Sequence, residues 1–165
     1  MSTLRAFGIA VTPPSGWDGE LYLRGEPALL AAASADPAGV APPAGTPVTA
    51  ILHTASFPLP VGRGDYGGGA VELMNPTDVF VSLLEHDPAE ANAPLFAAPP
   101  PWPLGVDDFS PRSLQRRIGG HGGCQRFFRV GRRAFCLYVV LGSYANRAAL
   151  LPSVNAMLAS LQLTA

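Results

Sequence analysis

One stretch near the end of the chain restricts the fold more than any other: residues 133–142, with the sequence Arg-Ala-Phe-Cys-Leu-Tyr-Val-Val-Leu-Gly. The stretch is apolar at both odd and even positions and is rich in aromatic and β-branched residues. An amphipathic helix would instead show a polar stripe at helical spacing. The pattern therefore predicts a central strand that is covered on both faces.

Other segments predict strands that pair around this one. We expect strands at residues 7–11, 20–24, 48–56, 78–86, 112–118 and 125–130. In the first two, apolar residues alternate with small or polar ones. We expect the first two of these to form a hairpin. We expect the last to join the central strand through the two-residue loop Gly131-Arg132.

Helices are expected to cover the sheet. Residues 27–33 and 69–74 are candidates for short helices, and the C-terminal segment 152–161 has apolar residues at helical spacing. Pro152 falls in the predicted first turn, where its missing N–H removes no hydrogen bond. We predict an α+β fold: an antiparallel sheet of five to seven strands flanked by helices in an α/β/α sandwich, with the C-terminal helix packed on the sheet.

The length and composition indicate a single domain over residues 1–165. The chain contains 18 glycines and 18 prolines, and we expect Ala/Pro-rich loops at about 25–47 and 87–108. Pro99 to Pro103 should be extended. This segment could be a rigid spacer or a ligand for a peptide-binding partner, and the favoured interpretation is a loop that Trp102 packs onto the protein. All 11 basic residues are arginine, and this usage with abundant alanine, glycine and proline indicates a high-GC bacterial source.

No segment is typical of a membrane protein. The first residues lack the apolar core of a signal peptide, and no stretch reaches the ~18 apolar residues of a membrane span. We expect a soluble protein, cytoplasmic as given or exported and processed, without a membrane span.

Charge is divided unevenly along the chain. Residues 1–108 contain three arginines and all 12 acidic residues, a net charge of −9, whereas residues 109–165 contain eight arginines and no acid, a net charge of +8. The two parts could fold together and pair these charges internally. Alternatively, the basic part could face an anionic partner.

Seven arginines fall within 22 residues that contain no acid: Arg112, Arg116, Arg117, Arg126, Arg129, Arg132 and Arg133. These residues are the candidates for a partner-binding surface. The partner we expect is a protein, possibly acidic, or a second copy of this chain. We do not expect nucleic-acid binding, because the overall pI is near 6.3 and no nucleic-acid motif is present.

Three features of the chain, taken in order, resemble a known family. A strand ends in Pro-Ser-Gly-Trp (residues 14–17), a meander ends in the apolar strand 134–142, and a closing helix has the sequence Val-Asn-Ala-Met-Leu-Ala-Ser-Leu (residues 154–161). This order resembles the PsbP-like α/β/α sandwiches, which include small bacterial proteins of unassigned function. The resemblance implies an antiparallel sheet flanked by helices and a non-catalytic role in binding or assembling other proteins. The long Ala/Pro segments depart from the family.

A glycine-rich segment matches a nucleotide-binding pattern by letter. Residues 62–67 read G-x-G-x-x-G, and the embedded Arg63-Gly64-Asp65 has the letters of an integrin ligand. A dinucleotide site needs a strand running into the loop and a full helix after it. Here prolines precede the loop, and Pro76 ends the following helix early. We therefore expect a flexible or tightly turned surface loop.

The histidines and cysteines suggest weaker candidate sites. His53, His86 and His121 lack the close spacing of metal ligands, although His53 and His86 end two strands that could be neighbours. If Gly131-Arg132 is a hairpin loop, Cys124 and Cys136 lie on opposite faces of the sheet and remain free thiols. Cys124 beside His121 could act as a nucleophile, because the surrounding arginines would favour a thiolate.

The favoured function is a non-catalytic binding, assembly or accessory protein that docks through its arginine-rich hairpin or its Pro/Ala loops. We assign no catalytic residue, metal ligand or cofactor. The alternative is a small enzyme or an anion-binding or ligand-binding protein. Its site would use the glycine-rich loops together with one imidazole and one thiol, namely Gly62, Arg63, Gly64, His121 and Cys124.

Overall fold

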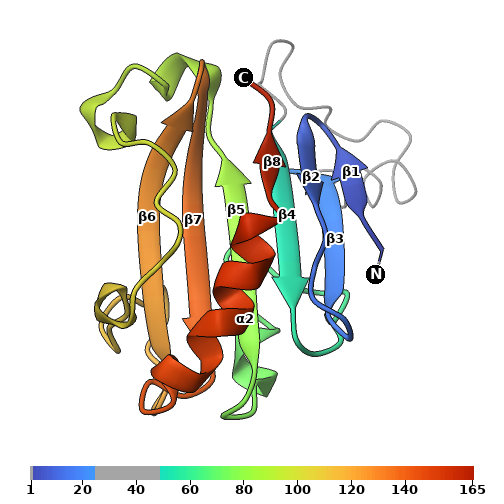
Figure 1. Ribbon diagram of the computed structural model, residues 1–165, viewed down its shortest axis with the longest axis vertical. Coiled ribbons are helices and arrows are strands. Elements are labelled where there is room, and N and C mark those ends of the chain that lie inside the picture. The colour runs from blue at the N-terminus through green and yellow to red at the C-terminus, as the bar shows by residue number, and fades with distance from the viewer. Residues whose placement is uncertain (1, 25–48) are drawn as a thin grey trace, which may run out of the picture.

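The computed structural model describes residues 2–24 and 49–165. Their main element is a five-stranded antiparallel sheet (Figure 1), whose strand order is β3 (Asp18–Leu23), β4 (Ala50–Ala55), β5 (Val79–Glu85), β7 (Arg133–Leu141) and β6 (Gly122–Val130). A second, small sheet has the order β1 (Leu4–Ala6), β2 (Ile9–Val11) and β8 (Gln162–Leu163). The predicted helix at 27–33 and the whole of the predicted 25–47 loop lie outside the described residues.

Strand β7 is the centre of the core. It pairs with β5 on one side and with β6 on the other, and its residues from Ala134 to Leu141 are all buried. Phe135, Leu137, Val139 and Leu141 belong to the core cluster on the helix side of the sheet. Cys136, Tyr138 and Val140 belong to the cluster on the opposite side. The prediction that this strand is covered on both faces is confirmed, but the sheet is not centred on it: β7 lies next to the edge strand β6, and β5 is the middle strand.

The C-terminal helix α2 (Arg147–Ala159) packs on one face of the main sheet, as predicted (Figure 1). The helix begins five residues earlier than expected, so Pro152 lies inside it and not in its first turn. The early start is favoured because Leu150, in the added turns, is buried against the sheet. Within the described residues, no helix is long and apolar enough to cross a membrane.

The opposite face of the sheet carries no α-helix in the part of the chain that the structure describes, so the helices expected on both faces are not found there. The 69–74 segment contains only a three-residue 3-10 helix, η1 (Val71–Leu73). Met74 follows it with an extended backbone, and Pro76 disfavours a helical conformation at Asn75. The second face is covered mainly by this segment and by the loop around residues 114–118.

The loop at 87–108 contains three short 3-10 helices: η2 (Pro88–Glu90), η3 (Pro94–Phe96) and η4 (Val106–Asp108). The first two begin with a proline, a residue that is favoured at the first position of a helix. Each of them is only three residues long. Trp102 packs edge-on against Phe128, with ring centroids 5.3 Å apart. The expectation that Trp102 packs this loop onto the protein is confirmed.

One strand prediction and one pairing prediction were wrong. Residues 112–118 form a loop, because Gln115 donates its backbone N–H to the Tyr138 hydroxyl (2.8 Å) rather than to a strand. Residues 7–11 do not pair with 20–24, because the chain turns at Phe7 and Gly8, whose φ angles are +55° and +73°. This turn pairs β2 with β1, while β3 pairs with β4.

The hairpin of β6 and β7 has the predicted register. Gly131 and Arg132 form its loop, and Cys124 lies opposite Val139. Cys124 belongs to the helix-side core and Cys136 to the opposite cluster, so both thiols are free. The expectation of two unpaired cysteines on opposite faces is confirmed.

Arg133 connects the small sheet to the main sheet. Its Nε lies 2.8 Å from a carboxylate oxygen of Glu85 at the end of β5. The same guanidinium donates hydrogen bonds to the carbonyl oxygens of Phe7, Gly8 and Thr164. The two ends of the chain are therefore held against the strands that form its core.

Gly142, directly after β7, lies against the backbone of Asn75 and Asp78, and a substitution there tests this close packing. A Cβ at this position would overlap the carbonyl oxygen of Asn75, so we expect Gly142→Ala to destabilise the protein by about 3 kcal/mol. Gly119 has no atom within 4 Å of the corresponding position, so Gly119→Ala is the matched control and should change stability little. The free energy of unfolding in urea measures both, and equal effects would contradict the packing described.

Candidate functional site

A groove lies on the face of the main sheet opposite α2. Its floor is formed by Tyr138 and Val140 of β7, and its volume is about 360 Å³. Residues 66–72 form one wall and residues 114–118 form the other. The groove therefore brings together segments that are about 45 residues apart in the sequence.

The first wall follows the glycine-rich loop, which is tightly turned. The backbone N–H of Gly64 donates to the Gly68 carbonyl at 2.8 Å. Gly67 has φ +84° and lies directly over Phe80, so a side chain there would be strained and would clash. Of the two conformations expected for this loop, the structure shows the tightly turned one.

This loop does not form a dinucleotide fingerprint. The strand before it ends at Ala55, and the helix after it is the three-residue η1. The Gly69 amide at the start of that helix donates to the Glu72 carboxylate at 2.7 Å. A carboxylate therefore already occupies the position that a phosphate would need.

The second wall is held by two hydrogen bonds. Gln115 donates its backbone N–H to the hydroxyl of Tyr138 on the groove floor. Arg116 lies 3.4 Å from Glu72, so this ion pair connects the two walls. Leu114 and Ile118 are partly buried against the second-face cluster. The loop thus has a defined position above the sheet.

The polar groups of the groove suit binding better than chemistry. Tyr66 packs edge-on against Tyr138, with ring centroids 5.4 Å apart. Burial raises the pKa of both phenols, so they remain neutral at physiological pH. A largely apolar cavity with a few polar groups at its edge is typical of a site that binds an apolar group and orients it.

Beside the groove, Arg63 and His53 anchor the glycine loop. Arg63 donates from Nε to His53 Nδ1 (2.7 Å) and forms an ion pair with Glu20. His53 Nε2 lies 2.8 Å from the Asp65 carbonyl oxygen, so this nitrogen carries the proton of the neutral ring. Burial, with the nearby Arg63 charge adding to it, lowers the pKa of His53 to about 4.

The three predicted ligand-loop residues, Gly62, Arg63 and Gly64, differ in their exposure to solvent. The Arg63 side chain is only 6% exposed, so the Arg63-Gly64-Asp65 tripeptide does not present its arginine to a partner. Gly62 and Gly64 are exposed, but neither is among the residues that line the groove.

The other histidines do not join His53. His53 pairs with Ser82, so His86 lies four residues further along the strand direction, on the order of 13 Å away. His86 packs against Phe96 and Phe127. Among the residues that the structure describes, no three His, Cys, Asp or Glu side chains are arranged to hold a metal ion.

His121 and Cys124 are not brought together. Cys124 lies in the helix-side core, whereas His121 lies three residues earlier, just before the start of β6, a spacing that would place its side chain on the opposite face. Burial raises the pKa of Cys124 to about 11, and this effect exceeds the opposing influence of Arg126. The expectation that nearby arginines favour a thiolate is therefore wrong.

The seven predicted arginines do not form one surface. Arg126, Arg133 and Arg116 form ion pairs with Asp108, Glu85 and Glu72, respectively. Arg129 donates to the Ala91 carbonyl at 3.1 Å. The three ion pairs match the expected internal pairing of basic and acidic parts of the chain.

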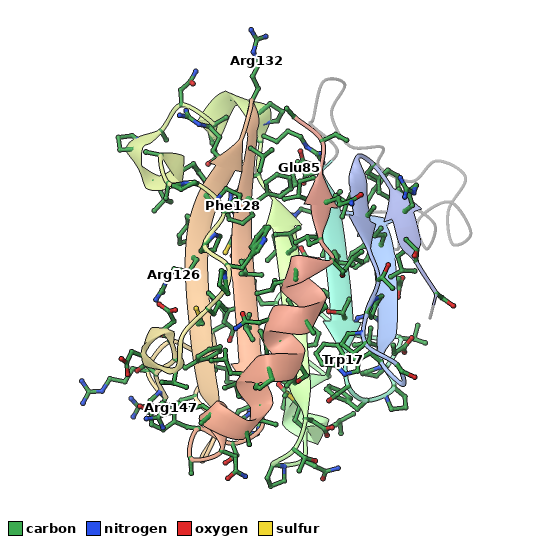
Figure 2. The ribbon with its side chains drawn as sticks, viewed as in Figure 1. Trp17, Glu85, Arg126, Phe128, Arg132 and Arg147 are labelled. Atoms are coloured by element: carbon green, nitrogen blue, oxygen red, sulfur yellow. The ribbon has the colours of Figure 1, made fainter. Side chains whose placement is uncertain are left out.

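Three of the seven are exposed and form no ion pair within residues 2–24 and 49–165: Arg112, Arg117 and Arg132. Arg132 projects from the hairpin tip at one end of the molecule, and Arg147, the eighth arginine of the basic part, lies at the opposite end (Figure 2). Arg147 stacks over the Tyr144 ring at 4.2 Å.

Sequence reasoning missed the groove residues Tyr66, Leu114, Ile118, Tyr138 and Val140. Tyr138 and Val140 were expected only as core residues, and Leu114 and Ile118 were assigned to a strand. The sequence does mark the two wall segments, one as glycine-rich and the other as arginine-rich. It does not show that they meet over β7, because that depends on the tertiary fold.

Comparison with known proteins gives no relative: no protein-family model, no curated protein and no solved structure matches this chain. The functional argument therefore depends on the groove and the charges around it.

The buried His53 predicts a pH dependence of stability. Its pKa is about 4 in the folded state and about 6.5 in the unfolded state, so the unfolded state takes up the proton first as the pH falls. Protonation of His53 should therefore lower the free energy of unfolding by about 3 kcal/mol between pH 7 and pH 4. Urea unfolding of wild type and His53→Gln at both pH values measures it, and an equal pH-dependent loss in both proteins would contradict the assignment.

Proposed function

We propose that the protein is a non-catalytic binding protein that docks an acidic segment of a protein partner on its 111–118 loop. The observation that carries the proposal is the pair of exposed arginines in this loop, Arg112 and Arg117, which form no ion pair within the described residues. Unpaired cationic groups on a positioned loop attract and orient an acidic partner.

The position of the loop supports this role. Gln115 and Arg116 attach it to Tyr138 and Glu72, so its neighbouring arginines are presented with little loss of loop entropy on binding. The Arg116 side chain is 75% exposed despite its ion pair. Its contact with Glu72 uses one N–H group of the guanidinium, so the remaining N–H groups can contact a partner carboxylate.

The hairpin is the weaker docking candidate. Arg126, Arg129 and Arg133 make contacts within the protein, which leaves Arg132 as the exposed arginine at the tip. The Pro/Ala-rich part of the 87–108 loop offers no comparable charge. We therefore assign docking to the 111–118 loop.

A bacterial accessory protein of the PsbP-like class remains our proposal for its wider identity. The antiparallel sheet and the closing helix agree with that class, while the described residues have an α-helix on only one face. The separation of His121 from the buried Cys124 also favours binding over nucleophilic catalysis.

Charge reversal tests the docking surface. A random 12-residue peptide display library is selected on the immobilised protein, and the affinity of the best peptide is measured by calorimetry. We expect enriched peptides to be acidic, and Arg112→Glu combined with Arg117→Glu to weaken binding at least tenfold. We expect the affinity of the wild type for this peptide to fall with added salt, because the contacts are electrostatic.

Arg132→Glu is the control, since it reverses a charge at the hairpin tip. It should change the affinity less than twofold. If Arg132→Glu weakens binding and the loop variant does not, the hairpin is the docking surface. If no acidic peptide is enriched, the proposed function is wrong.

A further inference from the structure

We infer that the groove beside the 111–118 loop accepts a large apolar side chain of the same acidic segment. The protein would then recognise a short motif in which an aromatic or leucine anchor is flanked by carboxylates. This inference rests on the proposed function and adds the class of sequence that the loop recognises.

The groove has the surface that such an anchor needs. Val71, Leu114, Ile118 and Val140 provide apolar contacts, and the ring of Tyr138 forms part of the floor. The volume of about 360 Å³ is larger than one aromatic side chain. Aromatic anchors seated in preformed pockets supply much of the binding energy of protein interfaces.

The floor of the groove is rigid. It belongs to β7, which is bonded to a strand on each side and is packed against α2 from behind. The bond from Gln115 to Tyr138 also fixes one wall to this floor. A preformed pocket requires little reorganisation on binding, so more of the contact energy contributes to affinity.

Glu72 positions a cation at the edge of the groove. One of its carboxylate oxygens accepts the Gly69 amide proton, and the other pairs with Arg116. Glu72 is thus held by the backbone and holds Arg116 at the rim. The Arg116 guanidinium has further N–H donors that can reach a carboxylate next to the seated anchor.

The arrangement of one short loop predicts a short motif. Leu114 and Ile118 face the groove, whereas Arg112 and Arg117 are exposed and are not among the lining residues. A ligand that meets both sets of side chains must extend out of the groove. A peptide segment can do this, and a small molecule confined to the groove cannot.

The experiment uses the best acidic peptide from the library selection. Its aromatic or leucine residue is replaced by alanine, and both peptides are measured against wild type and Leu114→Ala. We expect the peptide change to weaken binding to wild type about tenfold or more. The same peptide change should reduce the affinity for Leu114→Ala by a smaller factor, because that variant has lost part of the pocket wall.

Leu95→Ala is the matched control, since Leu95 is an exposed leucine (56%) outside the groove. It should bind both peptides like wild type. If the anchor residue contributes less than twofold, or contributes equally in wild type and Leu114→Ala, the groove inference is wrong. If the arginine variant still weakens binding in that case, the proposed function stands alone; if no acidic peptide binds, both are wrong.

Discussion

The burial of β7 on both faces is the constraint on which the rest of the structure depends. One set of its side chains forms the core under α2, and the alternate set forms the second-face cluster. Tyr138 and Val140 belong to that second set and are also the floor of the groove. The strand that stabilises the fold therefore also fixes the shape of the candidate site.

Topology divides the arginine-rich segment into two groups. On β6 and β7, side chains meet acidic or carbonyl groups of preceding segments, and Arg133 is the clearest example. Its ion pair with Glu85 is only 16% and 13% exposed, and removing one partner would leave a largely buried charge unpaired. The 111–118 loop lies outside the sheet, so Arg112 and Arg117 remain exposed and available to a partner.

The sequence was informative where burial is local and continuous, as in β7, the hairpin register and the closing helix. It misled where a local pattern had two possible causes. Residues 112–118 form a loop in which Leu114 and Ile118 pack against the second-face cluster while the arginines remain exposed. The pairing of β2 with the two-residue β8 joins opposite ends of the chain, and no local period indicates such a contact. Arg63 of the glycine-rich loop is likewise buried through contacts with His53 of β4 and Glu20 of β3, which are distant from it in the sequence.

The most direct test of the central claim is a map of the bound surface by two-dimensional amide NMR, with the best acidic peptide added stepwise. We predict that shifts concentrate in residues 66–72 and 112–118 and at Tyr138 to Val140 of β7. The hairpin tip around Arg132 and the exposed side of α2 should remain unchanged. Shifts centred on the hairpin tip or on α2, with the groove residues unaffected, would contradict the account.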